Sequence, residues 1–353
     1  MPDNLLAESR QRGLSEVPFE FLNALIRGRR SRLYEGDRLR DLAETGDLND
    51  LAYELFPREG IRTALDLERL LTGACVAEFG SLIRYVSGAY GRLYMGLLSW
   101  FQVEALKLLL RLLGREKALD TAERMLPELP EGLALPVASL LESRSVGEFI
   151  ERITLTRVRE AAMAAMPVYK RTGKKAYLEM ALDRGRLATV SEALEDLPRV
   201  VRGSCLPPVR MEMDANRLLA VLRATRTYGI KWEALSPVLP ADHGELNANT
   251  LRAIHAHPDG QQVMQALPFL RDRLDSPEQA ESPGAVEEVL WAQTVRLAER
   301  QYRSELAGPA ILVSYYYLKR NELRQLIALV QLVGRDASPR EVEERLGLER
   351  SPR

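Results

Sequence analysis

Two histidines, His255 and His257, have the spacing closest to a metal-binding motif in this sequence. Imidazole is a common zinc ligand, and on a β-strand side chains two positions apart point to the same face. The preceding residues 251–254 have a helical pattern, however, and on a helix such side chains diverge. Pro258 then ends the element. We therefore interpret the histidines as the C-terminal end of a surface helix, where cations complement the helix dipole, in preference to a metal site.

Residues 172–175, Thr-Gly-Lys-Lys, are the closest match to a phosphate-binding loop. They lack the upstream glycine with which such a loop cradles phosphate oxygens, so the sequence predicts no nucleotide site. It contains no Gly-x-Ser-x-Gly elbow and no Cys-x-x-Cys pair, and its two cysteines, Cys75 and Cys205, are far apart, which fits a reducing cytosol. We predict no catalytic residue, no cofactor and no metal.

Four arginines, Arg27, Arg29, Arg30 and Arg32, follow an apolar helical segment over residues 19–26. One interpretation is a solvated last turn whose cations complement the helix dipole. The other is a docking patch for an acidic partner, and these four residues are our candidates for such an interface. Nucleic-acid binding ranks third, because nothing extends the patch and the net charge of the chain is −1.

The 353 residues are 46% hydrophobic and 28% charged, which is typical of a globular protein with a large core. A net charge of −1 and a pI near 6.4 give no general attraction for nucleic acid or anionic lipid. The polar start of the sequence predicts no secretory signal. The most apolar stretch, residues 97–113, carries Glu104, Lys107 and Arg111 and is short for a membrane span, so we predict a buried helix there.

Apolar residues recur at helical spacing along almost the whole sequence, and alternating β-patterns are nearly absent. Capping signals mark several helix starts, because a serine or threonine precedes an acidic or amide side chain by three positions. These signals begin at Thr63, Ser145, Ser276 and Ser338. The sequence predicts an all-α fold.

Three stretches share one pattern, in which a polar or aromatic lead-in is followed by a dense apolar helix and a closing glycine. They run from Trp100 to Gly114, from Glu212 to Gly229 and from Tyr317 to Gly334. Their separation exceeds the repeat length of about 20–50 residues in solenoids. We therefore predict three similar helical subdomains around a common centre, over residues 1–125, 126–230 and 231–353. Pro207 and Pro208 are expected to interrupt the second subdomain before its last helix.

Each of these stretches carries charges at helical spacing in apolar surroundings. The pairs are Glu104 with Lys107, Asp214 with Arg217 and Lys319 with Glu322. We predict that they form polar contacts where subdomains meet, in preference to a proton-transfer role. The run Tyr315–Tyr317 is interpreted as core packing.

The last segment, YYYLKRNELRQLI from Tyr315 and then SPREVEERL from Ser338, resembles the C-terminal signature of the V-type and archaeal-type ATPase central-stalk family. The members of this family are the C subunits of prokaryotic enzymes and the d subunits of eukaryotic ones. FEFLNALIRGRRSRL from Phe19 is similar to the family's opening helix, and FQVEALK from Phe101 to a further element. Three positions depart from the family pattern: Ala105 and Glu322 stand where it often has asparagine, and Leu25 replaces an arginine.

The resemblance implies a funnel of three pseudo-threefold-related helical subdomains without an active site. Its mouth would receive the central shaft subunits of the rotary ATPase, and its base would sit on the membrane proteolipid ring. One copy per complex would transmit torque for proton or sodium transport, held at the cytoplasmic side of the membrane without spanning it. Two alternatives remain: a free helical scaffold or regulatory protein that binds a peptide or helix in a central groove, and a helical hydrolase that uses the region of His255 and His257.

Overall fold

The computed structural model describes residues 19–61, 63–240, 244–305 and 308–348. Of these residues, 76% are helical and none lies in a β-strand. Helix in an average globular protein accounts for about 30–35% of residues. The all-α prediction is confirmed.

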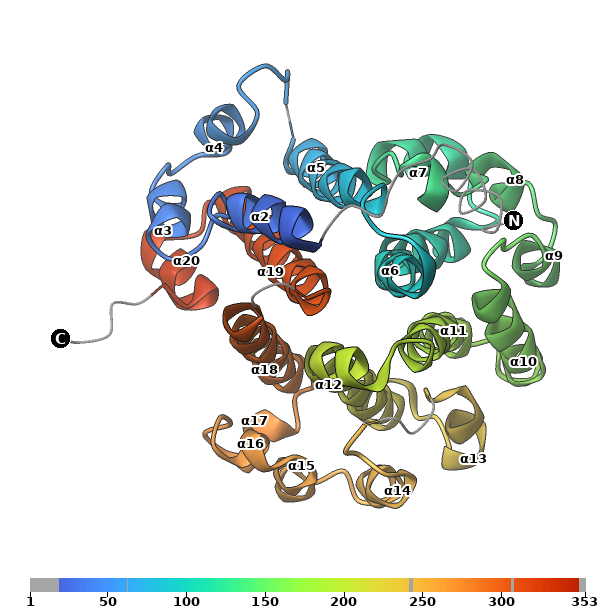
Figure 1. The fold of residues 1–353 in the computed structure, drawn as a ribbon. Helices are drawn as coiled ribbons and strands as arrows, with labels where there is room; N and C mark the ends of the chain where they lie inside the picture. Colours follow the sequence, from blue (N-terminus) through green and yellow to red (C-terminus); the bar gives the residue numbers. More distant parts are fainter. Residues whose placement is uncertain (1–18, 62, 241–243, 306–307, 349–353) are drawn as a thin grey trace.

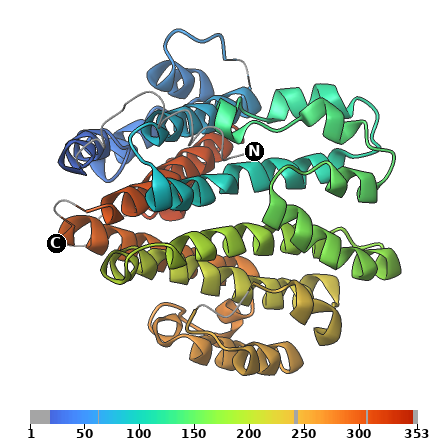
Figure 2. The ribbon, with the colours of Figure 1, turned by 45° about the vertical axis from the view of Figure 1, so that its right-hand side comes forward.

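Six long helices surround a common centre and are seen nearly end-on in Figure 1. They are α5 (Ala64–Ile83), α6 (Gly88–Leu112), α11 (Ala176–Glu195), α12 (Arg199–Arg223), α18 (Pro283–Ser304) and α19 (Ala310–Val333). After a turn of 45° the long helices are seen to run in one general direction (Figure 2). They form three hairpins, α5–α6, α11–α12 and α18–α19, because only a few residues separate the two members of each pair.

The hairpins contact one another through polar bonds at both ends of their helices. Between α6 and α11, Arg92 lies 2.9 Å from Asp196, and Arg111 lies 2.6 Å from Glu179 near the other end. These contacts make α6 and α11 antiparallel. They also place the α5–α6 link and the α11–α12 link at the same end of the molecule.

The contacts between α12 and α18 and between α5 and α19 place the third link at the same end. Gln301 near the end of α18 donates to the carbonyl of Ser204 near the start of α12. At the start of α19, Tyr315 donates to Glu78 near the end of α5. All three short links therefore lie at one end. We call it the connector end, defined by residues 84–87, residues 196–198 and the described residues 305, 308 and 309 between α18 and α19; the opposite end is the open end.

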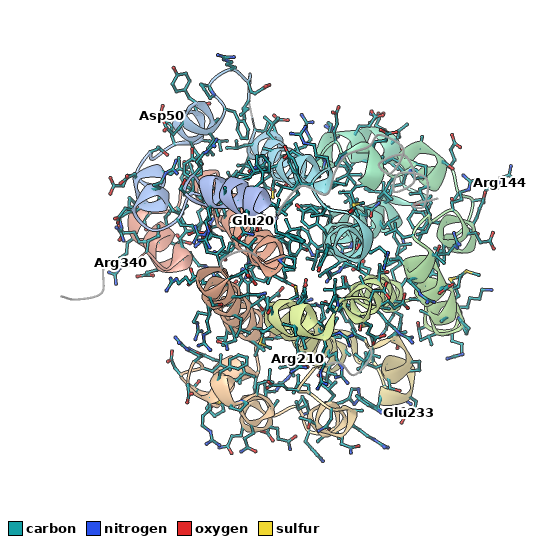
Figure 3. All side chains as sticks on the ribbon, in the orientation of Figure 1. Glu20, Asp50, Arg144, Arg210, Glu233 and Arg340 are labelled. Atoms are coloured by element: carbon teal, nitrogen blue, oxygen red, sulfur yellow. The ribbon has the colours of Figure 1, made fainter. Side chains whose placement is uncertain are left out.

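Shorter helices lie outside this ring in three groups (Figure 1). The first group is α2 (Phe19–Arg30), α3 (Asp37–Ala43), α4 (Leu48–Leu55) and α20 (Pro339–Leu346); the second is α7 (Ala118–Met125), α8 (Val137–Leu141), α9 (Val146–Glu151) and α10 (Thr156–Thr172); the third is α13 (Trp232–Leu235), α14 (Ala248–Ala256), α15 (Gly260–Ala266), α16 (Pro268–Arg271) and α17 (Pro277–Ala280). Short 3-10 turns at Glu131–Leu133 and Ser236–Val238 and a π turn, η2 (Ala224–Tyr228), complete the helices. Side chains fill the spaces between the helices, whereas Asp50, Arg144, Glu233 and Arg340 project from the periphery (Figure 3).

Helices also join segments that are distant in the sequence. The C-terminal α20 packs on α3, and Arg40 donates to the carbonyl of Leu348 at 3.1 Å. The last residues of the predicted third subdomain thus contact the first. The threefold relation and the subdomain boundaries stay predictions.

The predicted helix starts are confirmed. Thr63, Ser145, Ser276 and Ser338 each cap a helix by accepting a hydrogen bond from the backbone N–H three positions later. Such caps satisfy amide groups that have no partner within the helix.

The three repeated stretches are the C-terminal parts of longer helices, since α6, α12 and α19 begin well before them. Gly114 and Gly229 have φ values of 80° and 56°, in the left-handed region that favours glycine after a helix. Gly334 differs, because its φ is −64° and the left-handed residue there is Asp336, with φ 56°. A glycine therefore closes all three helices as predicted, and only the first two of these glycines are left-handed.

The predicted interruption at Pro207 and Pro208 is wrong, because α12 continues through both prolines. A proline lacks the N–H that would bond the carbonyl four positions earlier, so Pro208 frees the carbonyl of Ser204. Gln301 on α18 donates its side-chain amide to that carbonyl. A neighbouring helix thus supplies the hydrogen bond that the proline removes.

By length and hydropathy α6 passes as a candidate membrane span, but 72% of its most apolar 18-residue window is buried inside the fold. It packs against α11 and α5. Within this structure α6 is a core helix, as the sequence predicts for residues 97–113. Tyr315, Tyr316 and Tyr317 are fully buried, which confirms their interpretation as core.

We predict that Gln301→Met lowers the free energy of unfolding by about 1–2 kcal/mol, because the carbonyl of Ser204 loses its donor. The loss should be smaller in a Pro208→Ala background, since alanine restores the backbone N–H. Urea unfolding of both single variants and the double variant measures this coupling. Equal losses in both backgrounds would contradict the proposed compensation.

Candidate functional site

The ring of helices contains a cavity of about 660 Å³, lined by α6, α11, α12, α18 and α19. Its lining residues come from the halves of these helices that face the open end. Arg111 and Arg223, near that end, have side chains 55% and 45% exposed. Deeper in, the side chains of Arg186 and Glu212 are only 1% and 7% exposed. The cavity is therefore a cup with an exposed rim and a buried floor.

The connector-end half of the ring is filled by apolar and aromatic side chains. Tyr94, Leu97 and Phe79 are each at most 1% exposed, and Tyr316 donates to the carbonyl of Leu97 at 2.8 Å. This packing closes the cup at its floor.

The floor is built on the carboxylate of Glu212 from α12. Its Oε1 lies 3.0 Å from Nη2 of Arg186 on α11 and 3.0 Å from Nη1 of Arg320 on α19. Its Oε2 accepts a hydrogen bond of 2.7 Å from the hydroxyl of Tyr317. One carboxylate thus joins three of the six long helices.

Arg320 is held by aromatic rings as well as by charge. Its guanidinium carbon lies 4.0 Å from the ring centroid of Trp100 and 5.0 Å from that of Trp291. Cations over aromatic faces gain about 0.5–2 kcal/mol, more when water is excluded. Arg320 therefore connects α6 and α18 to the carboxylate of Glu212.

Burial alone would raise the pKa of Glu212, because the charged form loses its hydration. The guanidinium groups of Arg186 and Arg320 and the hydroxyl of Tyr317 outweigh that effect and lower this pKa to about 2. Burial, together with the Glu212 carboxylate, raises the pKa of Tyr317 well above its usual value. At neutral pH the floor contains an ionised carboxylate and a neutral phenol.

The charged residues predicted to lie where subdomains meet contact residues that are distant in the sequence. Lys107 binds Glu104 at 2.8 Å within α6 and Asp183 of α11 at 2.7 Å. Burial would lower the pKa of Lys107, but the two carboxylates outweigh it and the pKa is raised. This lysine links residues predicted in the first and second subdomains.

The residues of the other two pairs also contact residues that are distant in the sequence. Lys319 binds Glu322 at 2.5 Å within α19 and Glu78 of α5 at 3.0 Å. Asp214 accepts the backbone N–H groups of Glu245 and Leu246 at 2.8 and 3.1 Å. Arg217 donates to the carbonyl of Leu246. The contacts with Glu78, Glu245 and Leu246 link residues predicted in different subdomains, whose boundaries stay predictions.

The arginine cluster lies at the end of α2, outside the cup. Arg27 donates to the carbonyl of Glu305 at 2.7 Å, and Arg29 to that of Glu78 at 2.8 Å. Arg30 forms an ion pair with Glu35. Arg32, in the turn after α2, is exposed and donates to the carbonyl of Gly28 at 3.3 Å. The contacts of Arg27 and Arg29 anchor α2 to the ring; docking of a partner at the cluster stays a prediction.

The two histidines lie where the sequence predicts. Helix α14 ends at Ala256, and His255 places Nε2 at 2.7 Å from the carbonyl of Ile230. Its ring lies 5.6 Å from that of Trp232. Across the described residues, no three His, Cys, Asp or Glu side chains are grouped as metal ligands.

Sequence reasoning did not identify the floor of the cup, although one signal was present. The three repeated stretches begin at Trp100, Glu212 and Tyr317. Arg320 contacts Trp100 and Glu212, and Glu212 accepts a hydrogen bond from Tyr317. The lead-in positions thus meet at one point. No repeat or motif marks Arg186.

A family model described as the ATP synthase (C/AC39) subunit matches residues 22–345. The chain belongs to this family. The match spans all six long helices and the cup between them, and it agrees with the resemblance seen in the sequence. No curated protein sequence matches the chain. As a C/AC39 family member, the chain is a subunit of a V/A-type ATPase and associates peripherally with a membrane complex.

For this C/AC39 family chain we predict that Glu212→Gln lowers the free energy of unfolding by about 3–5 kcal/mol, because two buried guanidinium groups lose their counter-ion. Urea unfolding at pH 7 measures this loss. Glu233→Gln, at an exposed position on α13, is the matched control and should change stability by less than about 0.5 kcal/mol.

The same substitution should alter the pH dependence of stability. The pKa of Glu212 is depressed in the folded state, from its ordinary value of 4.5 to about 2. Its stabilising contribution is therefore complete above about pH 4.5 and is lost as pH falls towards 2. The difference in unfolding free energy between wild type and Glu212→Gln should narrow over this range. A difference that stays constant from about pH 6 to about pH 2.5 would contradict the ionised, paired state.

Proposed function

We propose that the chain is the non-catalytic central-stalk subunit of a V/A-type rotary ATPase, which seats the central shaft on the membrane proteolipid ring and transmits torque. The observation that supports this proposal most directly is the cup, which is open at one end, closed at the other and lined by ion pairs between neighbouring helices. Family membership supplies the ATP synthase context.

The size of the cup suits the tip of a helical shaft. An α-helix is about 10 Å across and rises about 5.4 Å per turn, so one turn occupies roughly 400 Å³. By volume alone, a cavity of about 660 Å³ corresponds to one to two such turns. A longer penetration would require the aromatic packing at the floor to open.

The walls suit a part that bears torque. Arg111 binds Glu179 across α6 and α11, and Arg223 binds Glu287 across α12 and α18. Lys319 joins α19 to α5 through Glu78. Ion pairs at each junction resist sliding of one hairpin against the next. A ring of helices that does not deform under torque transmits the rotation of the shaft to the proteolipid ring.

In this proposal the shaft subunits enter the open end and the proteolipid ring lies against the connector end. One copy is present per complex, because a single shaft meets a single ring. The subunit lies at the cytoplasmic side of the membrane and moves with the rotor during proton or sodium transport. The sequence lacks a phosphate-binding loop, so the subunit itself is expected neither to bind nor to hydrolyse ATP.

The arginine cluster is proposed as a contact for an acidic partner. Arg27 and Arg32 are its exposed members, and the contact of Arg27 with Glu305 lies beside the α18–α19 link. The cluster is therefore near the connector end. Exposed cations at such a joint favour association that depends on salt.

Site-specific cross-linking tests the orientation. Tyr228→Cys places a thiol at the rim of the cup, and Val200→Cys places one at the connector end, where Val200 is 84% exposed. With a photoreactive maleimide label, the rim should cross-link to a soluble shaft subunit and the connector end to a small membrane proteolipid. Mass spectrometry of the products from complexes purified in mild detergent identifies both.

Two outcomes would overturn the proposal. Cross-linking of both positions to the same partner would contradict the assigned orientation. Purification of the chain with neither a shaft subunit nor a proteolipid would favour a free scaffold that binds a helix in the same cup.

For the arginine cluster, Arg32→Ala should reduce co-purification with the complex several-fold at low salt. The difference from wild type should narrow as salt rises, because salt screens the contact that the variant has lost. Arg340→Ala on α20, with a side chain 88% exposed, is the matched control. Thermal unfolding should be unchanged in both variants, since among the described residues the exposed Arg32 side chain donates only a local hydrogen bond, to Gly28. Equal recovery of the two variants at every salt concentration would rule out the patch.

A further inference from the structure

We infer that the floor of the cup is a binding site for a carboxylate side chain carried on the tip of the helix that enters it. This inference rests on the proposed function and goes beyond it, because it names the chemistry by which the shaft is recognised. It is built on hydrogen-bond donors of Arg186 that the described part of the chain leaves unused.

Arg186 is 1% exposed and lines the cup. Its Nη2 binds Glu212, but its Nε and Nη1 have no hydrogen-bond partner among the described residues. A guanidinium has five N–H donors, and three of them belong to these two nitrogens. Buried donors are almost always paired, and each unpaired charged donor is costly. An acceptor from outside the chain would complete the site.

The charges of the floor point to an anionic acceptor. Arg186 and Arg320 share the single carboxylate of Glu212, so two guanidinium groups have one directly bound counter-ion between them. The next acid along α11, Asp183, is bound by Lys107 at 2.7 Å. In a site of low dielectric, one added negative charge is attracted strongly.

The walls favour a singly charged carboxylate over a phosphate or a nucleotide. Glu104, Glu179 and Glu287 line the cup above the floor. Each of these carboxylates binds a cation of the wall, Lys107, Arg111 or Arg223. The wall cations are therefore already paired and offer little to a polyanion. A helix tip with one acidic residue would find the unused donors of Arg186 at the floor. The size of the cup also fits a helix tip of one to two turns.

The test is a double-mutant cycle between the full chain and the shaft subunits of the same ATPase. Each Asp or Glu at the tip of the shaft is changed in turn to Asn or Gln, and the Kd is measured for wild type and for Arg186→Gln. One amide substitution should weaken binding to wild type about tenfold or more and change binding to Arg186→Gln less than about threefold. Arg303→Gln, with a side chain 79% exposed, is the control and should bind every shaft variant as wild type does.

The outcomes separate this inference from the proposed function. If wild type does not bind the shaft, both fail. If it binds but every acidic substitution weakens wild type and Arg186→Gln equally, or none weakens wild type, the carboxylate site is wrong and the proposed function stands. Should Arg186→Gln fail to fold, thermal unfolding of the wild-type chain decides: the native shaft tip, as a synthetic peptide, should raise its Tm and the amide peptide should not. Equal shifts in Tm would overturn the site.

Discussion

The carboxylate of Glu212 is the interaction on which the arrangement of the long helices depends. Three side chains from α11 and α19 converge on it, and none can move without leaving a buried charge or hydroxyl unpaired. Apolar residues of similar volume could stabilise such a position equally well. What the charges add is a fixed register of α11, α12 and α19 together with a polar floor.

That floor divides the molecule into two unlike ends. Towards the connector end, tyrosine and phenylalanine rings fill the ring of helices, and Tyr94 and Tyr316 donate their hydroxyls to backbone carbonyls. Towards the open end, the same helices carry arginine and glutamate around the cavity. A single change in side-chain character along each helix thus produces a cup that is closed at one end, and the proposed rotor joint depends on this feature.

Hydrogen bonds between residues close in the sequence could be predicted from the sequence, whereas contacts between distant residues could not. The caps at Ser145 and Ser338 depend on residues three positions away, so a sequence pattern suffices to predict them. The continuity of α12 through Pro208 depends on Gln301, which is distant in the sequence and carries no motif. Arg186 pairs with Glu212 for the same kind of reason: only the packing of α11 on α12 brings them together. The repeated stretches did mark Trp100, Glu212 and Tyr317, but periodicity alone does not say that such positions meet.

The order of the hairpins along the chain has a consequence for biogenesis. The ring closes between α5 and α19, the first and last of the long helices, so closure involves residues of very high sequence separation, such as Glu78 and Lys319. During synthesis, α5, α6, α11 and α12 emerge while Glu212 has Arg186 but lacks Arg320 and Tyr317, and while Trp100 lacks the guanidinium of Arg320. A nascent or truncated chain without α19 leaves uncovered the apolar surface on which α19 packs, and exposed apolar surface is what chaperones and proteases act on. Because α19 is the last long helix to be synthesised, the apolar surface is covered only when the whole ring is complete.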